Sequence, residues 1–215
     1  MTSRVRCRAL AVAISSVALA SAAAAQVKVE LGATIGRYAP MGSFQPSPAN
    51  SEDLPHSPGD LARTALGGQL RLWVAPRIGF ELAATTSSGS VGGGIIPDGV
   101  SSNISARVST GTAQLLFRVT HDQSRARIWI GAGGGAVQHG GDAYAAYGKP
   151  VNYGGVVGVG SAIRINGGLS IDLGVSAMIY DLDIRGFTLP DRPEVTERGR
   201  QVDMLLRTGL SYSWH

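Results

Sequence analysis

Hydrophobic and polar residues alternate at every second position along most of the chain after residue 26. In the segment 27–36 (VKVELGATIG) the odd positions are apolar, whereas the even positions are charged, polar or glycine. A period of two is typical of β-strands whose two faces meet different surroundings. The pattern recurs in seven further segments, so the sequence predicts eight strands: 27–36, 61–74, 77–85, 103–120, 126–137, 151–165, 168–180 and 202–214.

The alternation changes phase in two places. In 103–120 the apolar positions switch parity near Ser109–Thr112, and they switch again at Asp181, directly after the seventh segment. An extra residue in one strand of an antiparallel pair would produce such a switch. We therefore expect a β-bulge near Ser109–Thr112.

The connections between the segments alternate between long and short. The long ones, 41–60, 86–102, 138–150 and 185–200, are rich in Gly, Pro, Ser and Asp. The short ones are Ala75-Pro76-Arg77, His121–Arg125 and Asn166-Gly167-Gly168, the last containing the Asn-Gly pair that favours tight hairpins. This order predicts an all-β, eight-stranded antiparallel up-and-down barrel with every long connection at one end.

Residues 1–25 have the three parts of a secretory signal peptide. Arg4, Arg6 and Arg8 precede the apolar run 9–19, and alanines 23–25 precede Gln26. We therefore expect residues 1–25 to be cleaved and residues 26–215 to form the barrel domain. Cleavage removes three of the 19 Lys and Arg residues, which leaves 16 against 15 acids. The basic character of the whole chain thus belongs partly to this segment, and we expect no nucleic-acid partner.

The two faces of the predicted barrel differ in bulk. One face carries Val, Ile, Leu and Phe, whereas the other carries charges among Gly, Ala, Ser and Thr, and 30 of the 215 residues are glycine. A crowded interior favours the small face inside, which turns the bulky face toward lipid. No apolar run after residue 25 is long enough for a membrane helix. A soluble lipocalin-like barrel would have the faces reversed. We expect interfacial girdles to be formed by aromatic residues near the strand ends: Trp73, Phe80, Phe117, Trp129, Tyr212 and Trp214.

The last strand alternates from Val202 to the aromatic residue Trp214, and His215 follows it. With the signal segment and the eight strands, this ending resembles the small outer-membrane β-barrel superfamily, which includes the outer membrane protein A barrel domain and opacity-type proteins. The resemblance implies a Gram-negative outer-membrane protein with both termini in the periplasm. It also implies contact with outer-membrane lipid, insertion by the barrel-assembly machinery, and a monomer.

Charged residues on the inward face are the main candidates for a functional site. Isolated charges in a narrow lumen are costly, so they must be paired or hydrated. We expect a network of ion pairs that closes the lumen, made of Lys28, Glu30, Arg63, Arg71, Glu81, Arg127, Arg164, Asp172, Asp203 and Arg207. The alternation also assigns Arg77, Arg107 and Arg118 to this face. A narrow anion-favouring channel lined by arginines is the alternative.

The sequence predicts a structural or adhesive surface protein, with no catalytic residue, cofactor or metal ligand. A lipid-modifying outer-membrane enzyme is a weaker alternative, since it needs Ser, His and an acid together near one rim. The four histidines are His56, His121, His139 and His215, and His56 and His139 fall in different predicted loops. We expect an extracellular partner to contact the connections 41–60 and 185–200, because binding residues concentrate in loops on rigid scaffolds.

Overall fold

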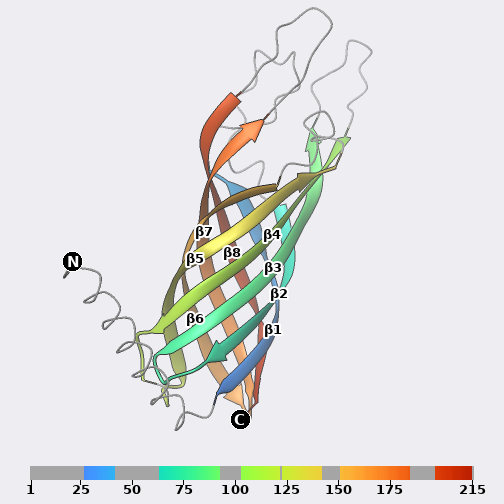
Figure 1. Cartoon of the computed structure of the whole chain (residues 1–215). Helices are drawn as coiled ribbons and strands as arrows, with labels where there is room; N and C mark the ends of the chain where they lie inside the picture. Colours follow the sequence, from blue (N-terminus) through green and yellow to red (C-terminus); the bar gives the residue numbers. More distant parts are fainter. Residues whose placement is uncertain are drawn as a thin grey trace, which may run out of the picture.

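Eight antiparallel strands form a closed barrel in the computed structural model (Figure 1). The structure describes residues 27–41, 63–92, 103–121, 123–141, 151–184 and 197–214. Consecutive strands pair with one another, and the first strand pairs with the last. The strands are β1 (Lys28–Pro40), β2 (Arg63–Trp73), β3 (Ile78–Gly92), β4 (Asn103–Arg118), β5 (Ala126–Gly140), β6 (Val151–Asn166), β7 (Leu169–Ile184) and β8 (Glu197–Trp214). The predicted up-and-down barrel is confirmed.

The seam between the first and last strands closes the sheet. Val29 on β1 pairs with Trp214 on β8, and Pro40 pairs with Asp203, so the start of β1 and the end of β8 lie at the same end. The three short turns also lie at this end, which we call the short-turn end. At the turn between β6 and β7, Gly167 has a φ of 54°, which a glycine adopts without steric cost. We call the opposite end, where the strands lead into the long connections, the long-connection end.

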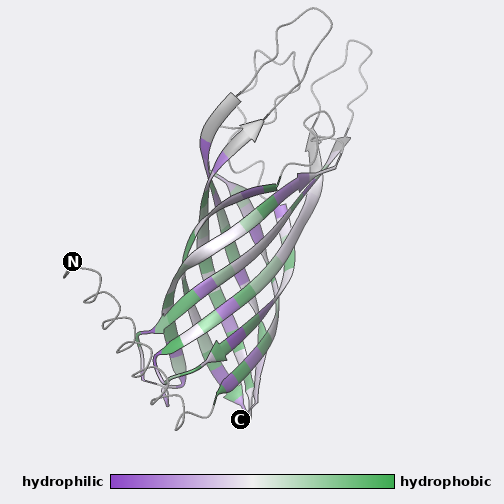
Figure 2. Ribbon diagram, viewed as in Figure 1, coloured by the Kyte–Doolittle hydropathy of each residue, from purple (hydrophilic) through white to green (hydrophobic). Residues whose placement is uncertain are grey.

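The outside of the barrel is apolar over most of its height. Leu31, Leu82, Ile130 and Leu210 point outward, and each is more than half exposed. The alternation of apolar and polar residues along each strand is visible in Figure 2. The bulky face is therefore outside and the small face inside, as the sequence predicts. Among the described residues, no helix is long and apolar enough to cross a bilayer.

Most strands extend further toward the long connections than the sequence predicts. Residues 86–92 continue β3, residues 138–140 continue β5, and residues 197–200 belong to β8. The sequence predicts loops in these places because the segments are rich in Gly, Ser and charged residues. The backbone pairing nevertheless continues, with Gly92 opposite Asn103 and Ile184 opposite Glu197. The segments 1–25, 42–62 and 185–196 lie outside the described residues, so the predicted signal peptide and most of the predicted contact loops are not described.

The predicted bulge in the fourth strand is wrong. β4 pairs continuously with both neighbours from Arg107 to Phe117. The register of β7 and β8 is likewise continuous through Asp181. In both places the chemistry of the two faces changes while the backbone stays regular, because apolar side chains such as Val108 and Met178 point inward near the long-connection end. The irregularity that does occur lies between Arg164 and Asn166, next to a short turn.

Candidate functional site

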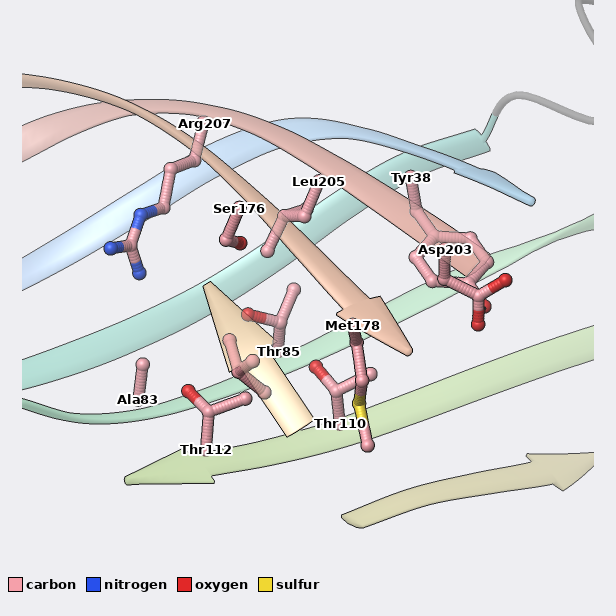
Figure 3. Close-up of a pocket in the computed structure, with 11 residues that line it drawn as sticks. Tyr38, Ala83, Thr85, Thr110, Thr112, Ser176, Met178, Asp203, Leu205 and Arg207 are labelled. Carbon is pink, nitrogen blue, oxygen red and sulfur yellow. The ribbon is translucent and has the colours of Figure 1, made fainter. Parts of the chain in front are cut away.

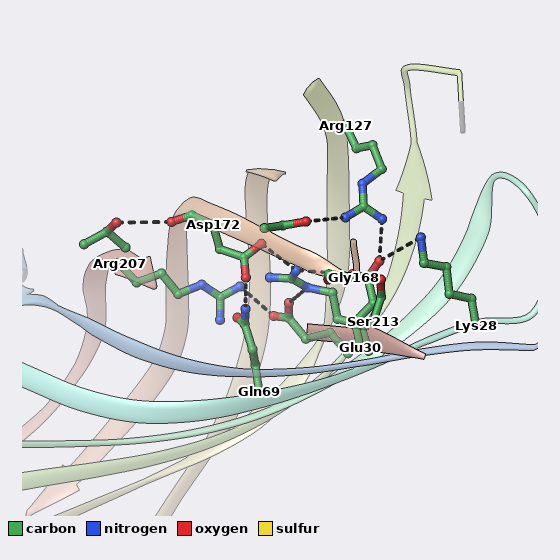
Figure 4. Close-up of polar contacts among 12 residues, drawn as sticks. Lys28, Glu30, Gln69, Arg127, Gly168, Asp172, Arg207 and Ser213 are labelled. Carbon is green, nitrogen blue, oxygen red and sulfur yellow. Dashed lines mark hydrogen bonds and ion pairs between the residues drawn. The ribbon is translucent and has the colours of Figure 1, made fainter. Parts of the chain in front are cut away.

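A network of buried ion pairs crosses the lumen near the short-turn end (Figure 4). We call it the luminal charge network, and its members are Lys28, Glu30, Arg71, Glu81, Arg127, Asp172 and Arg207. They come from β1, β2, β3, β5, β7 and β8, so residues far apart in the sequence meet here. All except Arg207 are at most 8% exposed.

Arg71 is at the centre of the network. Its Nε donates to Glu81 Oε2 at 2.7 Å and its Nη1 donates to Asp172 Oδ1 at 3.0 Å. Glu30 Oε2 lies 3.7 Å from the same Nη1. The Arg71 residue is only 1% exposed. One guanidinium thus contacts three carboxylates, an arrangement that satisfies its charge without bulk water.

Two further pairs reach across the lumen between strands that are not neighbours. Arg127 on β5 donates to Glu30 on β1, four strands away around the barrel and therefore on the opposite wall. Arg207 on β8 donates through Nη2 to Glu81 Oε1 on β3, three strands away, at 2.6 Å. Because these side chains reach across the lumen, they occupy the route that a solute would follow along the barrel axis.

Two tryptophans pack among these charges instead of forming an interfacial girdle. Trp73 and Trp129 are each 3% exposed, and their rings meet edge to face with centroids 6.2 Å apart. The guanidinium of Arg118 lies 3.8 Å from the ring centroid of Trp73, and that of Arg71 lies 4.2 Å from Trp129. The girdle prediction is therefore wrong for both tryptophans. Both rings face inward because they occupy positions of the same parity as Arg71 and Arg127.

The other four aromatic residues predicted for a girdle point outward near the short-turn end. Phe80, Phe117, Tyr212 and Trp214 are 47–48% exposed on the outer surface. Tyr212 and Trp214 contact each other edge to face, with centroids 5.0 Å apart. They mark the edge of the apolar surface near the short-turn end.

Glycines leave the space that the two inward tryptophans fill. A Cβ atom on Gly79 would lie 2.7 Å from the Trp73 ring, and one on Gly160 would lie 2.6 Å from the Trp129 ring. Side-chain atoms do not approach this closely, so only glycine fits at either position. The small inward face predicted from the sequence thus has a specific packing role here.

Five other arginines predicted for the inward face are not members of the luminal charge network. Arg63 and Arg164 are half-buried, and neither makes an ion pair with another described residue. Arg77 and Arg107 are exposed, so their inward assignment is wrong. Arg77 precedes β3 in a turn, and Arg107 lies on the part of β4 where the outward positions become polar. Arg118 is buried at 1% and donates to the carbonyl of Pro76 at 3.0 Å.

A second polar cluster lies toward the long-connection end and was not predicted as a group. Asp203 accepts hydrogen bonds from the hydroxyls of Tyr38 and Tyr180 and, at 3.0 Å, from the amide of Gln201. The Nε2 atom of His139 lies 3.4 Å from the Tyr180 hydroxyl. We call these five residues the aspartate–tyrosine cluster. The common parity of Gln201, Asp203 and Arg207 along β8 was the signal that could have placed Gln201 there.

His139 also corrects the sequence interpretation. It lies on β5 with 6% exposure, not in a loop, because β5 continues to Gly140. His121 is exposed in a short turn, and His56 and His215 lie outside the described residues. In the described parts of the chain, no three His, Cys, Asp or Glu side chains gather as metal ligands would.

A small cavity separates the two polar groups (Figure 3). Its wall carries the hydroxyls of Thr85, Thr110, Thr112 and Ser176, and Asp203 and Arg207 both line it. Its volume of about 30 Å³ accommodates only a few water molecules, since each needs roughly 10–15 Å³. Apolar side chains pack beside it toward the long-connection end, in a cluster of Tyr38, Ala65, Val108, Val137, Val156, Met178, Tyr180 and Leu205.

Comparison with known proteins identifies the fold. No protein-family profile matches the sequence, and no curated protein matches it. The outer membrane protein OprG from Pseudomonas aeruginosa superposes with a TM-score of 0.60 at 15% identity, covering 87% of this chain and 96% of that one. The N-terminal barrel of Pseudomonas aeruginosa OprF has a TM-score of 0.48 at 8% identity, covering 87% and 97% of the two chains. The OprG superposition confirms the barrel fold of the small outer-membrane proteins that the sequence resembles.

Proposed function

We propose that this chain is an integral outer-membrane β-barrel with a closed lumen, which serves a structural or adhesive role at the cell surface. The outward band of exposed Leu, Ile, Val and Phe carries this proposal. A soluble barrel would expose that area to water, whereas an outer-membrane barrel places it in lipid. The shared fold with OprG supports the same location. The long connections between β1 and β2 and between β7 and β8 would then lie outside the cell.

The luminal charge network supports a closed lumen. A channel needs a continuous water-filled route, but here Arg127 meets Glu30 and Arg207 meets Glu81 across the barrel. The Trp73–Trp129 pair fills space at the same end. We therefore expect the structural or adhesive role to depend on the outer surface and the long connections, without catalysis and without transport along the axis.

A narrow anion-favouring channel is the second candidate, because the same region has an excess of cations. Five of its buried or half-buried side chains are cationic, whereas three are acidic: Lys28, Arg71, Arg118, Arg127 and Arg207 against Glu30, Glu81 and Asp172. An excess of positive charge favours anions in a pore. This candidate requires the ion pairs to open.

Two experiments test these proposals. The first compares boiled and unboiled outer-membrane fractions by gel electrophoresis, where a folded membrane barrel changes mobility on heating. A soluble periplasmic protein without that change would refute membrane insertion. The second records single-channel currents from the barrel in planar bilayers. We expect no steady conductance; anion-selective steps that shrink when Arg71 is replaced by Gln would favour the channel instead.

A further inference from the structure

We infer that the aspartate–tyrosine cluster binds one ferric ion inside the barrel. The donor atoms are Oδ2 of Asp203 on β8, the hydroxyl oxygens of Tyr38 on β1 and Tyr180 on β7, and Nε2 of His139 on β5. These residues come from four strands that are far apart in the sequence, so no ligand spacing marks them there, and the sequence predicts no metal ligand. The inference goes beyond the structural or adhesive role and does not depend on it.

The donor atoms are spaced like neighbouring ligands of a single ion. Oδ2 of Asp203 accepts the hydroxyls of both tyrosines, that of Tyr180 at 2.7 Å. Nε2 of His139 lies 3.4 Å from the Tyr180 hydroxyl. With metal–ligand bonds of about 2.0–2.1 Å, neighbouring ligands are roughly 2.8–3.4 Å apart in octahedral or tetrahedral geometry. A metal ion can therefore replace the hydroxyl protons with little movement of the strands.

Asp203 lacks the counter-ion that the other buried carboxylates have. Glu30, Glu81 and Asp172 each pair with at least one arginine. Asp203 is 3% exposed, yet it makes no ion pair with any residue that the structure describes. Its hydrogen-bond donors are neutral, namely two phenols and the amide of Gln201. Because a buried charge without a counter-ion is costly, this carboxylate favours a bound cation.

A second buried oxygen lies beside the same carboxylate. The Gln201 side chain donates from Nε2 to Asp203 Oδ1 at 3.0 Å. Its Oε1 atom is buried and has no hydrogen-bond partner among the described residues, although Gln201 is only 3% exposed. Buried acceptors are almost always satisfied in folded proteins. An ion at this position would have a further oxygen donor within reach.

The small cavity next to the cluster limits the size of the ligand. Tyr38 and Asp203 line it and lie next to each other at one side of it (Figure 3). Its volume of about 30 Å³ has room for an ion with a water molecule and excludes an organic ligand. Arg207 also lines the cavity, but its guanidinium donates to Glu81 at 2.6 Å.

The chemistry of the donors favours a hard, trivalent cation. Carboxylate and phenolate oxygens are hard ligands, and imidazole also binds iron. Metal ligands bind in their deprotonated form, so the two phenols release their protons to solvent while the iron stays ferric. One carboxylate and two phenolates then carry three negative charges. A ferric ion neutralises them, whereas a divalent ion would leave one negative charge buried.

The test uses the full chain refolded in detergent micelles, with folding verified by its mobility on unheated gels. Ferric nitrilotriacetate is added to the folded barrel and, in a parallel sample, during refolding, so that slow entry is distinguished from a lack of binding. We expect about one iron per barrel after desalting, together with the visible charge-transfer absorption and the resonance Raman bands of coordinated phenolate. Tyr38→Phe, Tyr180→Phe and Asp203→Asn should each weaken apparent affinity roughly tenfold or more.

Tyr153→Phe is the matched control, because this tyrosine is 77% exposed on the outer surface, and it should bind iron like the wild type. His139→Gln supplies a further test that leaves both phenols in place, and it should shift the absorption band and weaken binding. A folded wild-type barrel without phenolate bands in either sample would refute the inference. The same holds if Tyr38→Phe/Tyr180→Phe retains the bands, or if Zn²⁺ displaces the iron at equal concentration. None of these results bears on membrane insertion, which the heating gel tests separately.

Discussion

Glu81 offers the sharpest test of the luminal charge network. Its carboxylate is 1% exposed and lies 2.7 Å from Arg71 Nε and 2.6 Å from Arg207 Nη2. Glu81→Gln keeps the side-chain shape but removes the charge, which leaves two guanidinium groups facing a neutral amide. Breaking a buried ion pair in this way costs about 3–5 kcal/mol. Arg71 keeps Asp172 as a partner at 3.0 Å, so we expect the lower end of that range.

The free energy of unfolding of the barrel in lipid vesicles would be measured by urea titration, followed by gel mobility and tryptophan fluorescence. Arg164→Gln is the control, because Arg164 is half-buried and makes no ion pair with a described residue; it should change stability by less than about 0.5 kcal/mol. In the double variant Glu81→Gln/Arg207→Gln, part of the loss should be recovered, with a coupling of about 0.5–3 kcal/mol. A loss below about 1 kcal/mol for Glu81→Gln would show that water already screens these charges and would refute a lumen closed by the luminal charge network.

Three further substitutions test other parts of the barrel by the same unfolding measurement. Tyr38→Phe removes a hydroxyl that donates to the buried carboxylate of Asp203 and should cost about 1.5–3 kcal/mol; unchanged stability would mean that water replaces the hydroxyl. Gly160→Val should cost about 1–3 kcal/mol, because its Cβ would lie 2.6 Å from the Trp129 ring; Gly155→Val, with nothing within 4 Å, is the matched control, and equal effects would contradict the packing argument. Leu82→Arg should cost about 2–4 kcal/mol if this outward position faces lipid, and a neutral effect would place it in water.

The barrel could be predicted from the sequence because its two faces must differ. Alternation such as Val29, Leu31 and Ile35 against Lys28, Glu30 and Thr34 follows from one face meeting apolar surroundings and the other a narrow interior. The alternation of long and short connections then determined the topology. The same reasoning correctly placed Glu30, Arg71, Glu81, Arg127, Asp172 and Arg207 inside.

The pattern was less informative near the long-connection end, for a physical reason. Outward positions such as Ser88 and Arg107 are polar there, whereas inward positions such as Val108 and Met178 are apolar. The contrast between the faces thus reverses while the backbone register continues. Assigning the inward and outward faces from the hydrophobic pattern alone therefore predicts a bulge or a loop at this point. Parity counted from the ends of paired strands would have placed His139 and Arg107 correctly.

Trp73 and Trp129 show a second limit of pattern reasoning. Aromatic residues near strand ends are typical of a membrane interface, yet both rings lie in the lumen beside Arg118 and Arg71. Contacts with neighbouring side chains decide their position. Each ring lies against a guanidinium group in a cation–π contact, and each packs on a glycine that leaves room for it. The arginines that extend into the lumen therefore pack against the two tryptophan rings near the short-turn end. This arrangement explains how a barrel interior with so many glycines still fills the space around its ion pairs, and it ties closure of the lumen to the two tryptophans as much as to the charges.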